Sequence, residues 1–253
     1  MDALEDFTTF RFSHTGKTRT VYRKGAGPAV IVMHEMPGIT PDVARFARRV
    51  AAAGFSVFMP SLFGKPGGEE GRLPMARAFA QVCISREWSL LATDKASPVV
   101  DWLRALAAYA FAEIGGRGVG AVGMCITGNF ALTMALDPYM VAPVLAEPSL
   151  PLRDPSGIHA APETLAHLRK RHAEEGLTVL GLRFQGDKFC MRPRFDALKR
   201  ELGDGFERVE LPASAGRTRA PHSVLTRELV DEAGHPTRAA LDRVLGFLGE
   251  RLL

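Results

Sequence analysis

The chain has 253 residues, of which 46% are hydrophobic and 24% are charged, as in an ordinary soluble globular protein. No apolar run approaches the roughly 18 residues that a membrane helix needs. The acidic N-terminus, residues 1–6, lacks the basic start and the apolar core of a signal peptide. We therefore expect a cytoplasmic protein with no membrane partner.

The net charge of +4 comes from 32 basic and 28 acidic residues that are spread along the chain. The densest basic cluster, residues 168–172, is short and is followed almost at once by two glutamates. Because interleaved aromatic residues and an extended run of charge are both absent, a solvated helix face explains this cluster better than a nucleic-acid site. We expect no nucleic-acid partner, and a mildly basic surface could still attract anionic substrates.

The spacing of cysteines, histidines and glycines does not predict a metal or cofactor site. The three cysteines, Cys83, Cys125 and Cys190, cannot form a fully paired set of disulfides and are thiols in a reducing compartment. The histidines lack an HExxH pair, and the carboxylates show no calcium-loop pattern. The glycine-rich residues 114–120 precede a strand instead of joining a strand to a helix, so they predict a turn and not a phosphate-binding loop.

The pattern of apolar residues predicts a chain of alternating strands and helices. Partial alternation predicts an antiparallel hairpin of residues 7–13 and 18–22. Short apolar runs rich in β-branched residues predict buried strands at residues 29–34, 55–59, 118–122, 141–146, 177–184 and 206–211. Helical spacing predicts helices at residues 41–53, 74–84, 89–110 with a fresh start at Ser97-Pro98, 129–136, 163–173, 192–202, 223–232 and 236–252.

This alternation implies right-handed crossovers and a mostly parallel sheet that is covered on both faces. We therefore predict one doubly wound α/β domain spanning residues 1–253. In such a sheet, the residues just past the carboxyl ends of the strands gather along one edge, whatever their separation in sequence. Functional side chains are therefore sought at the strand ends.

Cys125 lies on a predicted turn between a buried strand and a helix, in Gly123-Met124-Cys125-Ile126-Thr127-Gly128. This turn is similar to the nucleophile elbow, whose usual form is Gly-x-Ser-x-Gly. A turn that tight places the side chain beside the first N–H groups of a helix, which favour a thiolate. Because Thr127 stands where the second glycine is expected, we expect looser or rearranged packing there. The alternative interpretation is a small buried cysteine at a strand end.

Four polar residues follow predicted strands or loops at the same edge: Glu35, Cys125, Asp187 and His222. Nucleophile, acid and histidine in this chain order are typical of α/β-hydrolases. Each residue also has a plainer explanation, since Asp187 could be a turn residue, His222 a surface histidine and Glu35 a solvated carboxylate. Their convergence favours one active site.

These residues resemble the dienelactone hydrolase family of the α/β-hydrolase superfamily. The specific parts are the turn His34-Glu35-Met36-Pro37-Gly38 and the cysteine elbow; Gly186-Asp187 and Pro221-His222 agree with the pattern. The resemblance implies an α/β-hydrolase fold, a Cys125-His222-Asp187 triad, and a Glu35 that interacts with the resting thiol. The sequence departs from the family pattern at Thr127, and at Ser223, where a glycine usually follows the histidine.

The resemblance also implies arginines that hold an anionic substrate. Arg86 is our candidate, and its alternative is a helix-end arginine paired with Glu87 or exposed to solvent. The backbone N–H groups of Ile126 and Met36 are the expected oxyanion donors, each contributing ~3 kcal/mol if well placed.

We therefore expect a cysteine-dependent hydrolase that opens a small anionic lactone or ester through an acyl-enzyme, as a monomer or small homo-oligomer. One alternative is a broad carboxylesterase or thioesterase on the same scaffold. The other is a protein without catalysis, which binds a ligand or senses oxidants on this fold, with Cys83 or Cys190 as a resolving thiol.

Overall fold

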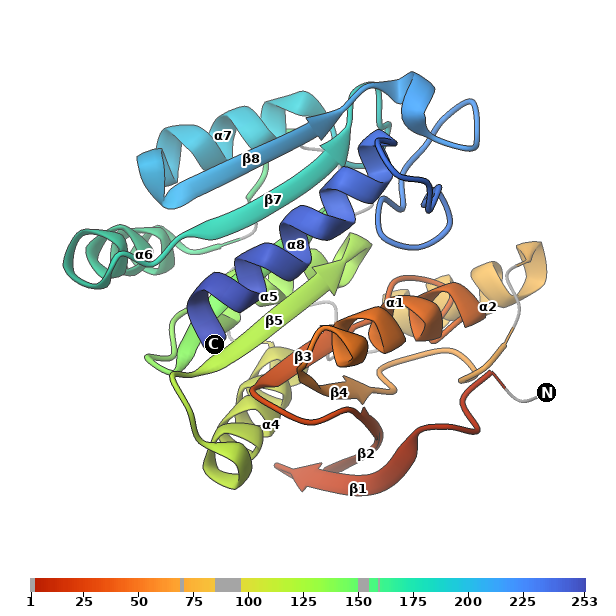
Figure 1. The fold of residues 1–253 in the computed structure, drawn as a ribbon, viewed down its shortest axis with the longest axis vertical. Helices are drawn as coiled ribbons and strands as arrows, with labels where there is room; N and C mark the ends of the chain where they lie inside the picture. Colours follow the sequence, from red (N-terminus) through yellow and green to blue (C-terminus); the bar gives the residue numbers. More distant parts are fainter. Residues whose placement is uncertain (1–2, 69–70, 85–96, 150–154, 159) are drawn as a thin grey trace.

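The computed structural model describes residues 3–68, 71–84, 97–149, 155–158 and 160–253. Its strands form one sheet of eight in the order β1-β2-β4-β3-β5-β6-β7-β8 (Figure 1). The strands are β1 (Thr8–His14), β2 (Lys17–Lys24), β3 (Ala29–Met33), β4 (Ser56–Pro60), β5 (Val119–Met124), β6 (Met140–Ala146), β7 (Val179–Phe184) and β8 (Phe206–Leu211). The α-helices of the described residues are α1 (Pro41–Ala52), α2 (Arg72–Ile84), α4 (Pro98–Ile114), α5 (Gly128–Met134), α6 (Pro162–Glu175), α7 (Arg192–Leu202) and α8 (Pro236–Leu252).

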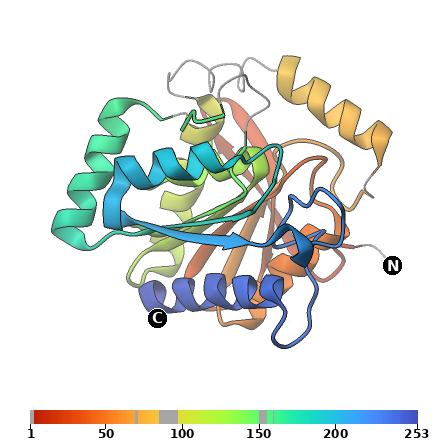
Figure 2. The same ribbon diagram turned by 90° about the horizontal axis from the view of Figure 1, so that it is seen from above.

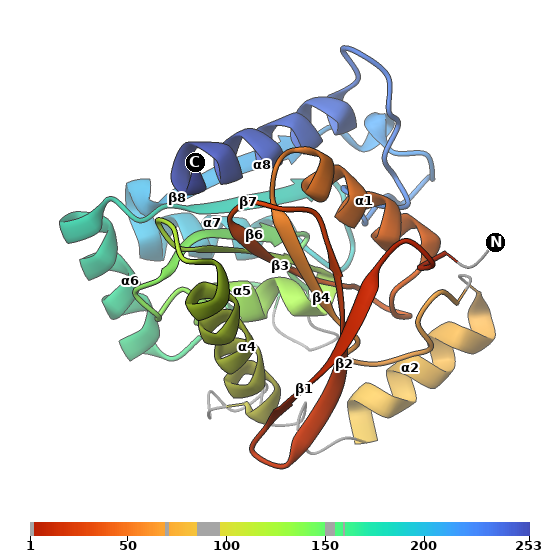
Figure 3. The same cartoon turned by 60° about the horizontal axis from the view of Figure 1, so that its bottom comes forward.

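The sheet is mostly parallel, which confirms the predicted fold class. The hairpin of β1 and β2 is antiparallel and pairs antiparallel with β4 at one end of the sheet (Figure 3). All pairs from β4 to β8 are parallel. The predicted strands and hairpin therefore appear at their expected places, with ends shifted by a few residues.

Helices cover both faces of the sheet, as expected. Figure 2 shows α1 and α8 on one face and α4, α5, α6 and α7 on the other. Each face has its own buried cluster. Phe46 and Phe247 pack with one face, and Trp102, Phe130 and Phe195 with the other. Burial of this apolar surface stabilises the layers that position the strand ends.

Helix starts and stops follow the sequence signals. Thr40 caps α1 by accepting the Val43 amide at 3.3 Å, and Pro41 is the first residue of the helix. The fresh start at Ser97-Pro98 is confirmed, because α4 begins at Pro98. Residues 89–96 of that predicted helix lie outside the described residues.

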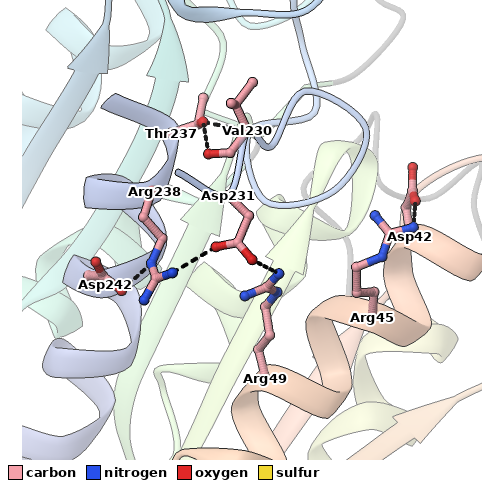
Figure 4. Close-up of polar contacts among 8 residues, drawn as sticks. All are labelled: Asp42, Arg45, Arg49, Val230, Asp231, Thr237, Arg238 and Asp242. Carbon is pink, nitrogen blue, oxygen red and sulfur yellow. Dashed lines mark hydrogen bonds and ion pairs between the residues drawn. The ribbon is translucent and has the colours of Figure 1, made fainter. Parts of the chain in front are cut away.

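The predicted helix at residues 223–232 is wrong. This segment consists of turns whose polar groups bond to distant parts of the chain instead of to the next helical turn. Asp231 pairs with Arg49 of α1 and, at 2.7 Å, with Arg238 of α8 (Figure 4). The Thr237 hydroxyl accepts the Val230 amide at 3.0 Å. Long-range bonds therefore override the helical spacing.

The strands that bear the site are neighbours. Strands β3, β5, β6 and β7 lie side by side and run parallel, and they are followed by Glu35, Cys125, Glu147 and Asp187, respectively.

No helix among the described residues is both long and apolar enough to cross a membrane.

Candidate active site

Cys125 occupies a sharp turn between β5 and α5. Its φ is 55°, a left-handed conformation that costs free energy for a residue with a Cβ. The turn also needs a glycine at position 123, because a Cβ there would lie 2.2 Å from the Thr127 carbonyl oxygen. This is the strand, turn and helix geometry that the sequence predicted, and it leaves Cys125 partly exposed in a pocket.

Thr127 is packed into the elbow instead of loosening it. Its side chain is fully buried, and Oγ1 accepts the Met124 amide at 2.9 Å. The same oxygen lies 3.0 Å from the Met33 carbonyl, to which it can donate. Gly128 takes over the close approach expected of the second glycine, since a Cβ on it would lie 2.9 Å from Pro148 Cα. The packing at this departure from the family pattern is rearranged, and it ties β5 to β3.

His222 is held by Asp187, as the sequence predicted. His222 Nδ1 lies 2.7 Å from Asp187 Oδ2. The other carboxylate oxygen accepts the amides of Phe189 at 2.8 Å and Cys190 at 3.1 Å, so the turn after β7 fixes the orientation of Asp187. Nδ1 therefore carries the proton that Asp187 accepts, and Nε2 is left for chemistry.

The charge of His222 depends on its neighbours. Burial opposes protonation, but the Cys125 thiolate and the Asp187 carboxylate outweigh it and raise the pKa of His222 well above its usual range. The buried Nε2 atom has no hydrogen-bonding partner within the described part of the chain. The Phe189 ring packs edge-on against the imidazole, with centroids 5.3 Å apart. Negative charge on Cys125 therefore favours the protonated form of His222.

Ser149 is a site residue that the sequence reasoning missed. Its hydroxyl lies 3.1 Å from Cys125 Sγ, and its amide donates to the Cys125 carbonyl at 3.1 Å. Asn129 Nδ2 donates to the Ser149 carbonyl at 3.2 Å. The sequence signal that could have identified Ser149 was its position three residues past the predicted strand at 141–146, at a strand end where site residues gather.

The expected hydrogen bond between Glu35 and the Cys125 thiol is absent from the described part of the chain. The two carboxylate oxygens of Glu35 accept hydrogen bonds from the hydroxyls of Ser223 and Thr226. The Cys125 sulfur instead lies 3.1 Å from the Ser149 hydroxyl. Burial raises the pKa of Glu35, and the two hydroxyl bonds reduce that rise. The serine after His222 therefore supplies a bond that glycine cannot.

His34 holds the turn that contains Glu35 and Met36. Burial lowers its pKa to about 4, so the imidazole is neutral. Its Nε2 accepts the Leu62 amide at 3.0 Å, and Nδ1 donates to the Glu35 carbonyl at 3.0 Å. The assigned tautomer follows from these two partners.

Glu147 is a second buried acid that the sequence reasoning missed. It follows β6 directly, has no exposed surface, and adopts a φ of 36°. The Val224 amide donates to its Oε2 at 3.1 Å. Burial raises the pKa of this carboxyl well above its usual range. The sequence showed only a glutamate at the start of a loop.

The site opens into a pocket of about 540 Å³. Cys125, His222 and Ser149 line it together with Met36 and Ile126, the two residues predicted to supply oxyanion donors. Phe189, which is 64% exposed, also lines the pocket. Arg227 also lines it, while the predicted substrate arginine, Arg86, lies outside the described residues. The described part of the chain shows no cluster of metal-ligating side chains.

Comparison with solved structures shows the same fold in several hydrolases. The "Putative Dienelactone Hydrolase" of Klebsiella pneumoniae is 18% identical, with a TM-score of 0.66 over 96% of this chain and 99% of that chain. A dienelactone hydrolase-like promiscuous phosphotriesterase from metagenomic libraries is 16% identical, with a TM-score of 0.62 over 98% of each chain. A cold-adapted esterase from an Arctic intertidal metagenomic library is 16% identical, with a TM-score of 0.59 over 97% of this chain and 93% of its own.

Among curated proteins, none matches the sequence. The model of the dienelactone hydrolase family matches residues 17–172, which include the first turn, the elbow and β6. The fold, the elbow and this match over more than half of the sequence agree, and the chain therefore belongs to the dienelactone hydrolase family of α/β-hydrolases.

Proposed function

We propose that residues 1–253 form one domain that hydrolyses small esters or lactones with Cys125 as the nucleophile. The observation that carries this proposal is the pairing of an elbow cysteine with an Asp187-oriented histidine in one pocket. A thiolate is the reactive form of cysteine, and His222, whose pKa is raised by negative charge on Cys125 and Asp187, is the base that takes the thiol proton.

The reaction has two stages. Cys125 Sγ attacks the carbonyl carbon of the ester or lactone, and the carbonyl electrons move onto oxygen to give a tetrahedral oxyanion. As the C–O bond breaks, the His222 proton passes to the leaving alkoxide, and a thioester remains on Cys125. His222, now neutral, takes a proton from water; the hydroxide attacks the thioester, and the acid and the thiolate are released with the proton back on His222.

Backbone N–H groups at the pocket are the proposed oxyanion donors. Ile126 lies in the short helical turn that begins at Cys125, and Met36 follows Glu35 in the turn after β3. Both residues line the pocket together with Cys125. Such donors are worth ~3 kcal/mol each in the transition state when they lie close to the developing negative charge. The His34 bond to the Glu35 carbonyl holds the turn that contains Met36, and the Thr127 bond to the Met33 carbonyl holds the elbow that contains Ile126.

The pocket supports a small substrate with an apolar body and an anionic group. Its volume of about 540 Å³ is that of a small-molecule site, and Met36, Ile126 and Phe189 supply apolar walls. Arg227 supplies positive charge at the same pocket. A dienelactone-like carboxylate fits this description, with Arg227 as a second candidate to bind it; the substrate-binding role of Arg86 stays a prediction.

A broad carboxylesterase or thioesterase is the alternative activity. The same catalytic groups serve these reactions, and the fold is shared with an esterase and with the thioesterase domain of the curacin biosynthetic pathway. A redox sensor is less favoured, because Cys190 is fully buried and burial raises the pKa of its thiol well above the usual range.

Hydrolysis of an ester panel tests the proposal. The panel contains p-nitrophenyl acetate, a neutral lactone, a dienelactone and an acyl thioester, and each is assayed with the wild type, C125A and C125S. We expect loss of turnover in both variants and a mass increase on wild type alone when a slow ester traps the thioester. Turnover that survives in C125A rules out Cys125 as the nucleophile. Preference for the dienelactone separates a lactonase from a general esterase.

A further inference from the structure

Glu147 is a buried acid beside the catalytic groups that no step of the proposed mechanism uses. Its side chain is fully buried, and its φ of 36° is uncommon for a residue with a Cβ. Oε2 accepts the Val224 amide, but Oε1 is buried without a hydrogen-bonding partner within the described residues. A buried, unpaired carboxyl oxygen costs free energy, so its retention needs a reason.

The fold places Glu147 beside the nucleophile and in contact with the segment that contains His222 and Val224, which we call the histidine segment. Met124 and Ala146 are paired across β5 and β6, so Cys125 and Glu147 are the next residues along two adjacent strands. The Glu147 amide donates to the Leu182 carbonyl of β7 at 2.7 Å, which fixes its backbone. Val224, whose amide Glu147 holds, lies two residues beyond His222. Glu147 thus joins β6 to the segment that carries the base.

The charged groups that act on Glu147 are those of the site. After burial, His222 has the largest effect and favours the ionised carboxylate, whereas Glu35 and Cys125 disfavour it. These groups come from the segment after β8, from the end of β3 and from the end of β5. Asp187, from the end of β7, contacts Nδ1 of His222. Because opposite charges favour each other, an ionised Glu147 favours the protonated form of His222.

We propose that Glu147 is a positioning residue for His222, which holds the histidine segment through the Val224 amide and, by gaining or losing its own proton, sets the pH range over which His222 stays protonated beside Cys125. At low pH the carboxyl is neutral and adds no charge. As pH rises the carboxyl ionises, and its negative charge retains the proton on His222. This role rests on the proposed function, since it concerns the same cysteine and histidine.

Alkylation of Cys125 by iodoacetamide tests this role without requiring turnover. The rate is measured from pH 5 to pH 10 by digestion and mass spectrometry of the Cys125 peptide, in the wild type and in E147Q. Glutamine keeps an oxygen for the Val224 amide but cannot ionise. We expect the step that reports loss of the His222 proton to move down by about one pH unit in E147Q, since one nearby opposite charge has an effect of that size.

D137N is the matched control. Asp137 is a nearly buried carboxylate at the opposite end of β6, where it pairs with Arg104 at 2.6 Å. Its loss can lower stability but leaves the alkylation profile of Cys125 unshifted. An unshifted profile in E147Q, with the protein folded, overturns the role of Glu147. A shift of the same size in D137N overturns it too, because the effect is then a general loss of stability.

A second measurement uses the wild-type protein alone, in case E147Q does not fold. The ¹³C NMR shift of the Glu147 carboxyl is followed over the same pH range. We expect titration well above the usual range of glutamate, coupled to a change at His222; titration near pH 4.5 overturns the proposal. Absence of ester turnover together with the expected alkylation shift removes the hydrolase proposal and leaves this one standing.

Discussion

The hydroxyl of Ser223 donates a hydrogen bond to the carboxylate of Glu35, which lies at the other end of the chain, after the first parallel strand. Together with the Thr226 hydroxyl, it fastens the histidine segment to the turn that bears Met36. The bond exists because the residue after His222 is serine. It therefore explains one departure from the family pattern in physical terms.

Replacement of Ser223 by alanine is expected to destabilise the protein by about 1–3 kcal/mol near pH 8, because a buried carboxylate oxygen loses its donor. The loss should shrink as pH falls, since the pKa of Glu35 is already raised and a protonated carboxyl needs fewer donors. Urea unfolding of S223A at pH 5 and pH 8 measures this. T226S, which keeps a hydroxyl, is the control. An equal loss at both pH values would show that packing, and not the hydrogen bond, causes the effect.

Replacement of Asp187 by asparagine is expected to lower kcat/KM for any ester substrate by roughly 10⁴-fold, as in other triads whose acid becomes an amide. The amides of Phe189 and Cys190 both donate to Oδ1, so the asparagine oxygen remains there and its NH₂ group faces His222. The NH₂ group then donates to Nδ1, and the proton of the imidazole moves to Nε2, where it blocks general-base catalysis.

Steady-state kinetics and thermal unfolding of D187N check this reasoning. The unfolding temperature should change little, because the two amide bonds persist. In addition, the pKa of His222 should fall, since the Asp187 carboxylate is one of the groups that raise it. Activity within tenfold of wild type would show that Asp187 does not control the tautomer of His222.

His34 should make stability depend on pH in the acid range. Its pKa is lowered to about 4 by burial, whereas in the unfolded chain it titrates near 6.5. The unfolded state therefore binds the proton first as pH falls, and stability that is complete above about pH 6.5 declines until about pH 4. The difference between the folded and unfolded pKa values corresponds to a loss of roughly 3 kcal/mol in the free energy of unfolding.

The free energy of unfolding of wild type and H34Q, measured between pH 4 and pH 7.5, checks this expectation. Glutamine offers a donor for the Glu35 carbonyl and an acceptor for the Leu62 amide but does not titrate in this range. The difference in the free energy of unfolding between wild type and H34Q should shrink as pH falls. Curves that stay parallel would show that His34 has the same pKa in the folded and unfolded states.

Much of the fold could be predicted from the sequence, because local patterns set most elements. The strand at residues 206–211 and the helix at residues 236–252 have the predicted ends. Apolar runs and proline at helix starts act locally, so they can be read without knowledge of the fold. The elbow at Cys125 and the Asp187 to His222 contact also followed, since both depend on where parallel strands end.

The missed features depend on contacts between distant segments. Residues 223–232 have helical spacing, but their donors bond to Glu35 and Glu147, which follow different strands. Ser149 and Glu147 were not predicted as site residues, and the register of β5 against β6 brings them to Cys125. A sequence shows which side chains can donate and accept, but the sheet register decides which of them meet.

Thr127 offers a direct test of how the chain tolerates a β-branched residue at the elbow. Its hydroxyl serves the Met124 amide and the Met33 carbonyl, both buried. In T127V the shape is retained and both backbone groups lose their partner, so we expect a loss of about 1–3 kcal/mol in the free energy of unfolding. T127S keeps the hydroxyl and should lose less. T127G resembles the common elbow but leaves a cavity and the same unpaired groups, so it should be at least as destabilised as T127V. The three variants are compared by urea unfolding, with Cys125 alkylation as a measure of elbow geometry. A T127G protein as stable as wild type would show that glycine alone suffices here and that the Thr127 bonds do not stabilise the elbow.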